Sequence, residues 1–189
     1  MKEWKQLSRQ SLKGLMNQST EQARLLSALV IGTLPAVLVG WLFEGVIVTY
    51  LRSPAVVVLT LSFFGLVLGW ADQRASQNRS LSSMGVREGL VVGMAQALAL
   101  VPGVSRSGVT ISAALLLGIS RADAARFSFL LGTPILVAAT ARSLYHLFQA
   151  GSGAKYPILP LVVGVVFSFA SGYLCIRYFL KFLQTRTYR

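Results

Sequence analysis

Long stretches without a charged residue are the feature that most constrains how this chain can fold. A helix that crosses a membrane needs about 20 predominantly apolar residues. Four segments meet this requirement, and the expected spans lie near 25–48, 53–71, 127–147 and 156–182. Charged residues make up 13% of the 189 residues, whereas a soluble domain carries about 25%. The sequence therefore predicts an all-α, multi-pass integral membrane protein.

A fifth apolar region, residues 89–120, is interrupted by one arginine, Arg106, close to Pro102 and Gly103. Its second part would be about 21 Å long as a helix, because each residue adds about 1.5 Å. The hydrocarbon core of a bilayer is about 30 Å thick. We therefore predict a re-entrant helix hairpin over 89–120, in which both ends return to one side of the membrane. The alternative is one long helix with a sharp kink at the proline.

The net charge of +12 could suggest a nucleic-acid partner, but the cations lie at the ends of the apolar runs rather than on one basic face. This placement is typical of a membrane protein, and no nucleic-acid partner is expected. One side of the membrane would receive residues 1–24, the 72–88 loop, Arg121 with Arg126, and the C-terminal end. The other side would receive only Arg52, Arg142 and Lys155. The first side is predicted to be cytoplasmic. Residues 1–24 are predicted to form a basic, polar surface tail, and 25–189 one transmembrane domain.

The string PGVSRSGVT, residues 102–110, combines an arginine with three hydroxyl side chains between apolar segments. An arginine at membrane depth is costly unless it has a partner or a water-filled cavity. Its planar fork of donors matches a phosphate oxyanion. Ser105, Ser107 and Thr110 can donate to phosphate oxygens or act as nucleophiles.

Two glycines and an expected helix start complete this turn. Gly103 and Gly108 allow the backbone to bend and to approach a ligand closely. A helix beginning near Ser107 would direct its amide groups and the positive end of its dipole at the same point. We therefore predict a phosphate-binding turn. The alternative is that Arg106 extends to the interface and the serines only cap a helix.

The string PGVSRSGVT resembles the signature of the undecaprenyl-diphosphate phosphatase family, the bacitracin-resistance type. The segments IGTLPA (31–36) and ISRADAARFSFLLGTP (119–134) are similar to other family segments, and the resemblance runs from about Arg24 to Lys181. It implies a hydrolase of the plasma membrane that releases phosphate from undecaprenyl diphosphate and regenerates the lipid carrier for cell-wall synthesis. It also implies two inverted repeats, partly represented here, each with a re-entrant hairpin, and a site open to the outer face.

The resemblance also implies the roles of individual residues. Its catalytic group would be Arg106, Ser105, Ser107 and Thr110, and its substrate-binding group Gly103, Val104, Gly108 and Gln96. The expected partners are a lipid diphosphate and the membrane, and a homodimer is considered. The alternative function is a non-enzymatic lipid-phosphate binder or a flippase-like transporter, because inverted repeats with broken helices also form transporters.

The family's other half-site, a Glu-x-x-x-Glu pair followed by Pro-x-Ser-Ser-x-Gly-His, has no counterpart in this sequence. The resemblance implies a divalent cation, Mg²⁺ or Ca²⁺, but its glutamate ligands are absent, and no metal-ligand residues are assigned. The four glutamates are Glu3, Glu21, Glu44 and Glu88, and no two are four residues apart. Glu21 is expected at a helix start, Glu44 at the membrane interface, and the lone His146 also at an interface.

We expect that the chain lacks the first hairpin, the span after it and the last span of the family. General-base assistance contributes roughly 10²–10⁴ in rate. These residues alone are therefore predicted to be weakly active or inactive.

Overall fold

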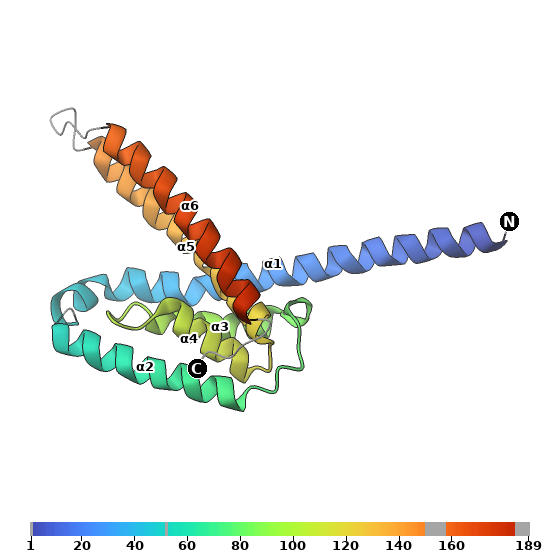
Figure 1. Ribbon diagram of the computed structural model, residues 1–189, viewed down its shortest axis with the longest axis horizontal. Coiled ribbons are helices and arrows are strands. Elements are labelled where there is room, and N and C mark those ends of the chain that lie inside the picture. Colours follow the sequence, from blue (N-terminus) through green and yellow to red (C-terminus); the bar gives the residue numbers. More distant parts are fainter. Residues whose placement is uncertain (1, 52, 150–157, 184–189) are drawn as a thin grey trace.

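The computed structural model describes residues 2–51, 53–149 and 158–183 (Figure 1). Within these ranges the secondary structure is helical, apart from one isolated β-bridge between Arg79 and Ile119. The prediction of an all-α fold is confirmed. In chain order the helices are α1 (Lys2–Tyr50), α2 (Pro54–Arg74), the short 3-10 helix η1 (Leu81–Ser83), α3 (Val86–Leu98), α4 (Arg106–Leu116), α5 (Arg121–Gln149) and α6 (Ile158–Leu183).

Four of these helices are long and apolar enough to cross a membrane, and they coincide with the four predicted spans. The candidate spans are Thr20–Phe43, Pro54–Arg74, Arg121–His146 and Leu159–Leu183. Helix α5 begins earlier than its predicted start at 127. The hydroxyl of Ser120 accepts a hydrogen bond from the amide of Asp123 at 3.3 Å, as a capping residue does, and Asp123 in the first turn suits the positive end of the helix dipole.

Helix α1 includes the segment that was expected to form a basic, polar surface tail. It runs without a break from Lys2 to Tyr50, and its N-terminal part extends away from the other helices (Figure 1). Glu21 lies inside this helix, so its prediction as a helix-start residue is wrong. Residues 1–24 contain no proline and a single glycine, so little opposes extension of the helix from the span. The side chain of Glu44 lies outside the described residues.

The predicted hairpin is confirmed as two short helices, α3 and α4, joined by residues 99–105, and the alternative of one kinked helix is wrong. The chain reverses at Gly103, whose φ of +89° is a conformation that favours glycine. The adjacent Pro102 cannot donate a backbone hydrogen bond to continue the helix. The hairpin lies between α1 and α2, with α3 against α1 and α4 against α2 (Figure 1).

Helix α3 is packed against α1 at backbone-to-backbone distance. A Cβ added to Gly89 would lie 2.6 Å from the Cα of Ala28, and one added to Gly93 would lie 2.7 Å from the Cα of Gly32. Farther along, a Cβ on Gly40 of α1 would lie 3.7 Å from Leu100. The two helices therefore run parallel from the hairpin base to its tip, and small residues let them approach closely.

Replacing Gly93 by alanine is expected to lower the free energy of unfolding by about 1–3 kcal/mol, because the new methyl group would meet backbone atoms rather than a movable side chain. The measurement is the unfolding midpoint of the purified protein in detergent. Gly69→Ala on α2 is the matched control, since nothing lies within 4 Å of a Cβ there. Equal midpoints for the two variants would contradict tight α1–α3 packing.

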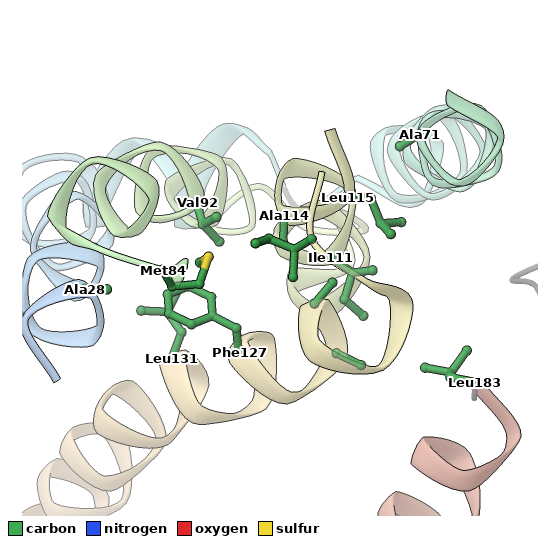
Figure 2. Packing of buried hydrophobic residues seen from close by; sticks show 13 residues of the cluster. Ala28, Ala71, Met84, Val92, Ile111, Ala114, Leu115, Phe127, Leu131 and Leu183 are labelled. Carbon is green, nitrogen blue, oxygen red and sulfur yellow. The ribbon is translucent and has the colours of Figure 1, made fainter. Parts of the chain in front are cut away.

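The hydrophobic core lies between the hairpin and the first half of α5. Met84, Val92, Phe127 and Leu131 gather beneath α3 (Figure 2). Helix α6 contributes little to this core, because none of its most apolar window is buried. The α5–α6 pair extends away from the hairpin with an apolar surface suited to lipid (Figure 1).

Candidate phosphate-binding site

Arg106 is the first residue of α4 and lies directly after the turn of the hairpin. The hydroxyl of Ser105 accepts a hydrogen bond from the amide of Gly108 at 3.2 Å, and its carbonyl accepts one from the amide of Val109 at 2.9 Å. These bonds cap the helix, which is the role that the alternative interpretation gave to the serines. The first amides of a helix have no acceptor within the helix, and those of Arg106 and Ser107 are among them. An anion is favoured at this point.

The side chain of Arg106 extends from α4 to α5. Its Nη1 donates a hydrogen bond to the carbonyl oxygen of Gly132 at 3.2 Å. The described residues form three ion pairs, whose cations are Arg79, Arg121 and Arg126, so Arg106 has no carboxylate partner among them. Arg106 therefore brings a half-buried cationic side chain to the positive end of a helix dipole, and no described carboxylate pairs with it.

The two serines beside Arg106 remain accessible. Ser105 is exposed and Ser107 is half-buried. The Ser105 hydroxyl already accepts a bond from Gly108, but its proton stays available for donation. Both hydroxyls can therefore donate to an anion bound at Arg106, although their catalytic role stays a prediction.

Thr110 does not share this accessibility. It is 1% exposed, and its hydroxyl lies 2.8 Å from the carbonyl oxygen of Arg106 and 2.7 Å from the hydroxyl of Ser128 on α5. One helical turn after Arg106, Thr110 faces α5 rather than the turn. The catalytic role expected of Thr110 stays a prediction. Sequence reasoning missed Ser128, whose signal was a hydroxyl inside an apolar span.

Gly103, Val104 and Gly108 pack closely within the turn. A Cβ on Gly103 would lie 2.7 Å from the Cα of Val57, and one on Gly108 would lie 3.1 Å from the Cβ of Ser105. The side chain of Val104 is buried, and its amide donates to the carbonyl oxygen of Val101 at 3.1 Å. The substrate contacts expected of these three residues stay a prediction.

Thr60 of α2 holds the turn in place, and the sequence gave no reason to single it out. Its hydroxyl donates a hydrogen bond to the carbonyl oxygen of Pro102 at 2.8 Å. It also bonds to the carbonyl oxygen of Val56 in its own helix at 2.7 Å. The tip of the hairpin is therefore fixed against the beginning of α2.

Gln96 of α3 is 2% exposed, and neither its amide nitrogen nor its amide oxygen has a hydrogen-bond partner among the described residues. Leaving one buried polar atom unsatisfied costs about 1–3 kcal/mol. An unsatisfied buried amide is a common sign of a site that receives a further polar group. Its assignment to the binding site stays a prediction.

Three carboxylates, those of Asp72, Glu88 and Asp123, are engaged at the opposite end of the hairpin. Asp72 pairs with Arg121 at 2.5 Å, and Asp123 accepts a hydrogen bond from the amide of Leu81 at 3.1 Å. Glu88 accepts a hydrogen bond from Arg79 at 2.8 Å, and this bond is the main reason why the pKa of Glu88 lies below its ordinary value.

No group of three or more histidine, cysteine, aspartate or glutamate residues gathers in the part of the chain that the structure describes. His146 is exposed near the end of α5, with its ring 6.0 Å from that of Tyr145. The described residues therefore do not fit the divalent cation that the family resemblance implies.

Comparison with known proteins shows similarity over most of the chain. The family described as "Bacitracin resistance protein BacA" matches residues 1–189. The chain is 48% identical over 166 residues to the "Undecaprenyl-diphosphatase" of Chromohalobacter salexigens. The matched region covers 88% of this chain and 62% of that protein. It is 47% identical over 165 residues to "Undecaprenyl-diphosphatase 2" of Stutzerimonas stutzeri, covering 86% of this chain and 60% of that protein. The chain thus spans less than two thirds of the length of these curated relatives. A match over its whole length shows that this chain belongs to the bacitracin resistance protein BacA family.

Proposed function

We propose that the tip of the α3–α4 hairpin binds the diphosphate headgroup of a polyprenyl lipid, and that the protein acts in the hydrolysis of undecaprenyl diphosphate to undecaprenyl phosphate and phosphate. The observation that carries this proposal is the position of Arg106 at the start of α4, without a carboxylate partner among the described residues. The names of the two relatives supply the substrate class. These names do not favour the alternative of a non-enzymatic binder or flippase-like transporter.

The position of the hairpin tip along α2 supports binding from the outer side of the membrane. Gly103 packs against Val57 and Thr60, in the first two turns of α2. This is the end of the bundle opposite to the 72–88 loop, which carries Arg74, Arg79 and Arg87 and is predicted to be cytoplasmic. We propose that the protein lies in the plasma membrane with its hairpin tip toward the outer face. A homodimer and the lack of a nucleic-acid partner stay predictions.

Hydrolysis breaks the bond between the terminal phosphorus and the bridging oxygen, and the lipid monophosphate leaves as water is added. Negative charge on the phosphoryl oxygens is best stabilised by fixed donors that are in place before the reaction. Arg106, the amides at the start of α4 and the hydroxyls of Ser105 and Ser107 would supply such donors. Because the described residues do not fit a divalent cation, no step is assigned to one.

Binding and hydrolysis can be measured separately on the purified chain in lipid nanodiscs. We expect saturable binding of undecaprenyl diphosphate, competition by inorganic pyrophosphate, and weak or no phosphate release. Undecaprenol, which lacks the headgroup, is the control and is expected not to compete. Absence of headgroup-dependent binding would refute the proposed site. Robust phosphate release would overturn the expectation of weak activity, and binding coupled to transbilayer movement would favour the transporter alternative.

A further inference from the structure

Gly132, in the interior of α5, lies directly against the guanidinium group of Arg106. A Cβ added to Gly132 would lie 2.7 Å from Nη2, 2.8 Å from Cζ and 3.1 Å from Nη1 of Arg106. The carbonyl oxygen of the same residue accepts the hydrogen bond from Nη1 at 3.2 Å. One residue of α5 therefore provides both the space for the guanidinium and the acceptor that orients it.

This contact differs from those of the glycines in the α1–α3 interface. At Gly89 and Gly93 the three nearest atoms are backbone atoms of α1, so the missing side chains allow two helices to approach. At Gly132 all three belong to the guanidinium of one side chain. Close packing of two helices does not explain this arrangement, because the neighbour is the flexible end of a side chain that could have turned elsewhere.

A glycine inside a long helix also lowers the stability of that helix relative to alanine. Gly132 lies well within α5 (Arg121–Gln149) and is buried. If only the helix mattered, alanine would be the better residue at this position. The glycine is therefore explained by what it allows Arg106 to do.

We propose that Gly132 is a positioning residue for Arg106: it holds the guanidinium over the start of α4 so that its free donors face the bound diphosphate. This inference rests on the proposed function of Arg106. Nη1 is partly used by the bond to α5, which fixes the plane of the fork. The remaining N–H groups are then aimed before the ligand arrives, which reduces the ordering that binding must supply.

The test compares Gly132→Ala with Gly164→Ala on the full chain. Gly164 lies inside α6 with nothing within 4 Å of an added Cβ, so it matches the backbone effect without a neighbour. We expect Gly132→Ala to weaken binding of undecaprenyl diphosphate about tenfold, because a displaced donor fork loses its alignment. We expect Gly164→Ala to bind as the wild type does. The unfolding midpoint is expected not to fall in either variant, because the neighbour displaced at Gly132 is the end of a flexible side chain.

Two further measurements separate positioning from a structural defect. In an Arg106→Ala background, Gly132→Ala is expected to cause no additional loss of binding, because the group that it positions is gone. In protein labelled with ¹⁵N-arginine, the side-chain signal that is missing from Arg106→Ala is expected to shift in Gly132→Ala and to stay in Gly164→Ala. This spectrum needs no ligand.

The outcomes distinguish this inference from the proposed function. If Arg106→Ala abolishes binding but Gly132→Ala binds normally, the positioning role is overturned and the proposed site stands. An additional loss in the Arg106→Ala background would also overturn it. If the wild type does not bind the diphosphate, the proposed function fails and the positioning role toward it fails too; an unshifted Arg106 signal would then show that the contact itself is absent.

Discussion

Replacing Arg106 by alanine is expected to weaken binding of undecaprenyl diphosphate by about tenfold to a hundredfold, because a hydrogen bond to a charged group contributes about 1.5–3 kcal/mol. The change removes the only side-chain cation that the structure places at the start of α4 among the described residues. In a water-poor surrounding a charge-assisted bond to phosphate is stronger than it would be at an exposed surface. Isothermal titration or filter binding with the purified protein in nanodiscs would measure the loss.

Arg87→Ala is the matched control for this prediction. It removes the same charge from an exposed position near the base of the same hairpin, and we expect binding to change less than about twofold because an exposed charge is screened by water and salt. Arg106→Lys keeps the charge but loses the planar fork, so an intermediate loss is expected. If lysine bound as well as arginine, simple charge rather than the oriented fork would account for the site. Equal losses in Arg106→Ala and Arg87→Ala would point to net charge alone.

The parts of the fold that the sequence predicted are those determined by neighbours in the chain. Hydropathy is a local property, so most ends of the four spans were predicted to within a few residues. The hairpin was also predictable, because the short apolar pieces and the Pro102–Gly103 pair lie together, and Gly103 does take a left-handed conformation. The start of α1 at Lys2 was not predicted, because a basic composition does not by itself stop a helix.

The parts of the site that the sequence did not predict depend on contacts between helices. Arg106 meets Gly132 across 26 residues, Thr110 meets Ser128 across 18, and Pro102 meets Thr60 across 42. A single sequence shows that Thr110 is a hydroxyl next to Arg106. It does not show that α5 lies opposite and takes that hydroxyl into its interface.

Some of the cations that flank the apolar segments also form ion pairs that the sequence did not predict. Arg79 and Arg121 were counted as cations that flank the spans, yet each bonds to a specific carboxylate at the base of the hairpin. Asp72 and Arg121 are 49 residues apart and become neighbours when the chain folds so that Arg79 lies beside residues 117–119. The bonds between Arg79 and the carbonyl oxygens of Leu117 and Ser83, at 3.2 Å each, show this arrangement.

The pair of Arg121 and Asp72 is expected to have the largest effect on stability. Arg121→Ala should lower the free energy of unfolding by about 3–5 kcal/mol, the usual result of removing one member of a buried ion pair. The side chain of Asp72 is 1% exposed, so water cannot replace the arginine without a rearrangement. Arg121 also donates to the side-chain oxygen of Gln77 at 3.2 Å, which is lost in the same change.

The helix dipoles make this pair more important than its two charges alone suggest. Asp72 lies in the last turn of α2, where the dipole is negative, and Arg121 begins α5, where the dipole is positive. Each charge is therefore unfavourable at its own helix end, and each offsets the other. For a protein of this size a loss of 1 kcal/mol lowers the melting temperature by about 2–4 °C, so the melting temperature of Arg121→Ala in detergent should fall by about 6 °C or more.

Arg126→Ala is the control, because it removes an arginine from an exposed ion pair instead of a buried one. Arg126 pairs with Asp123 at 3.6 Å on the same helix, and its side chain is 49% exposed, so its loss should cost less than about 1 kcal/mol. A double variant that replaces Asp72 and Arg121 together by leucine is expected to recover part of the loss, because the buried carboxylate is removed together with the arginine. If Arg121→Ala and Arg126→Ala melted at the same temperature, the base of the hairpin would be held by apolar packing alone. A clear difference would show that the paired charges join α2 to α5 and thereby fix the position of the hairpin that carries Arg106.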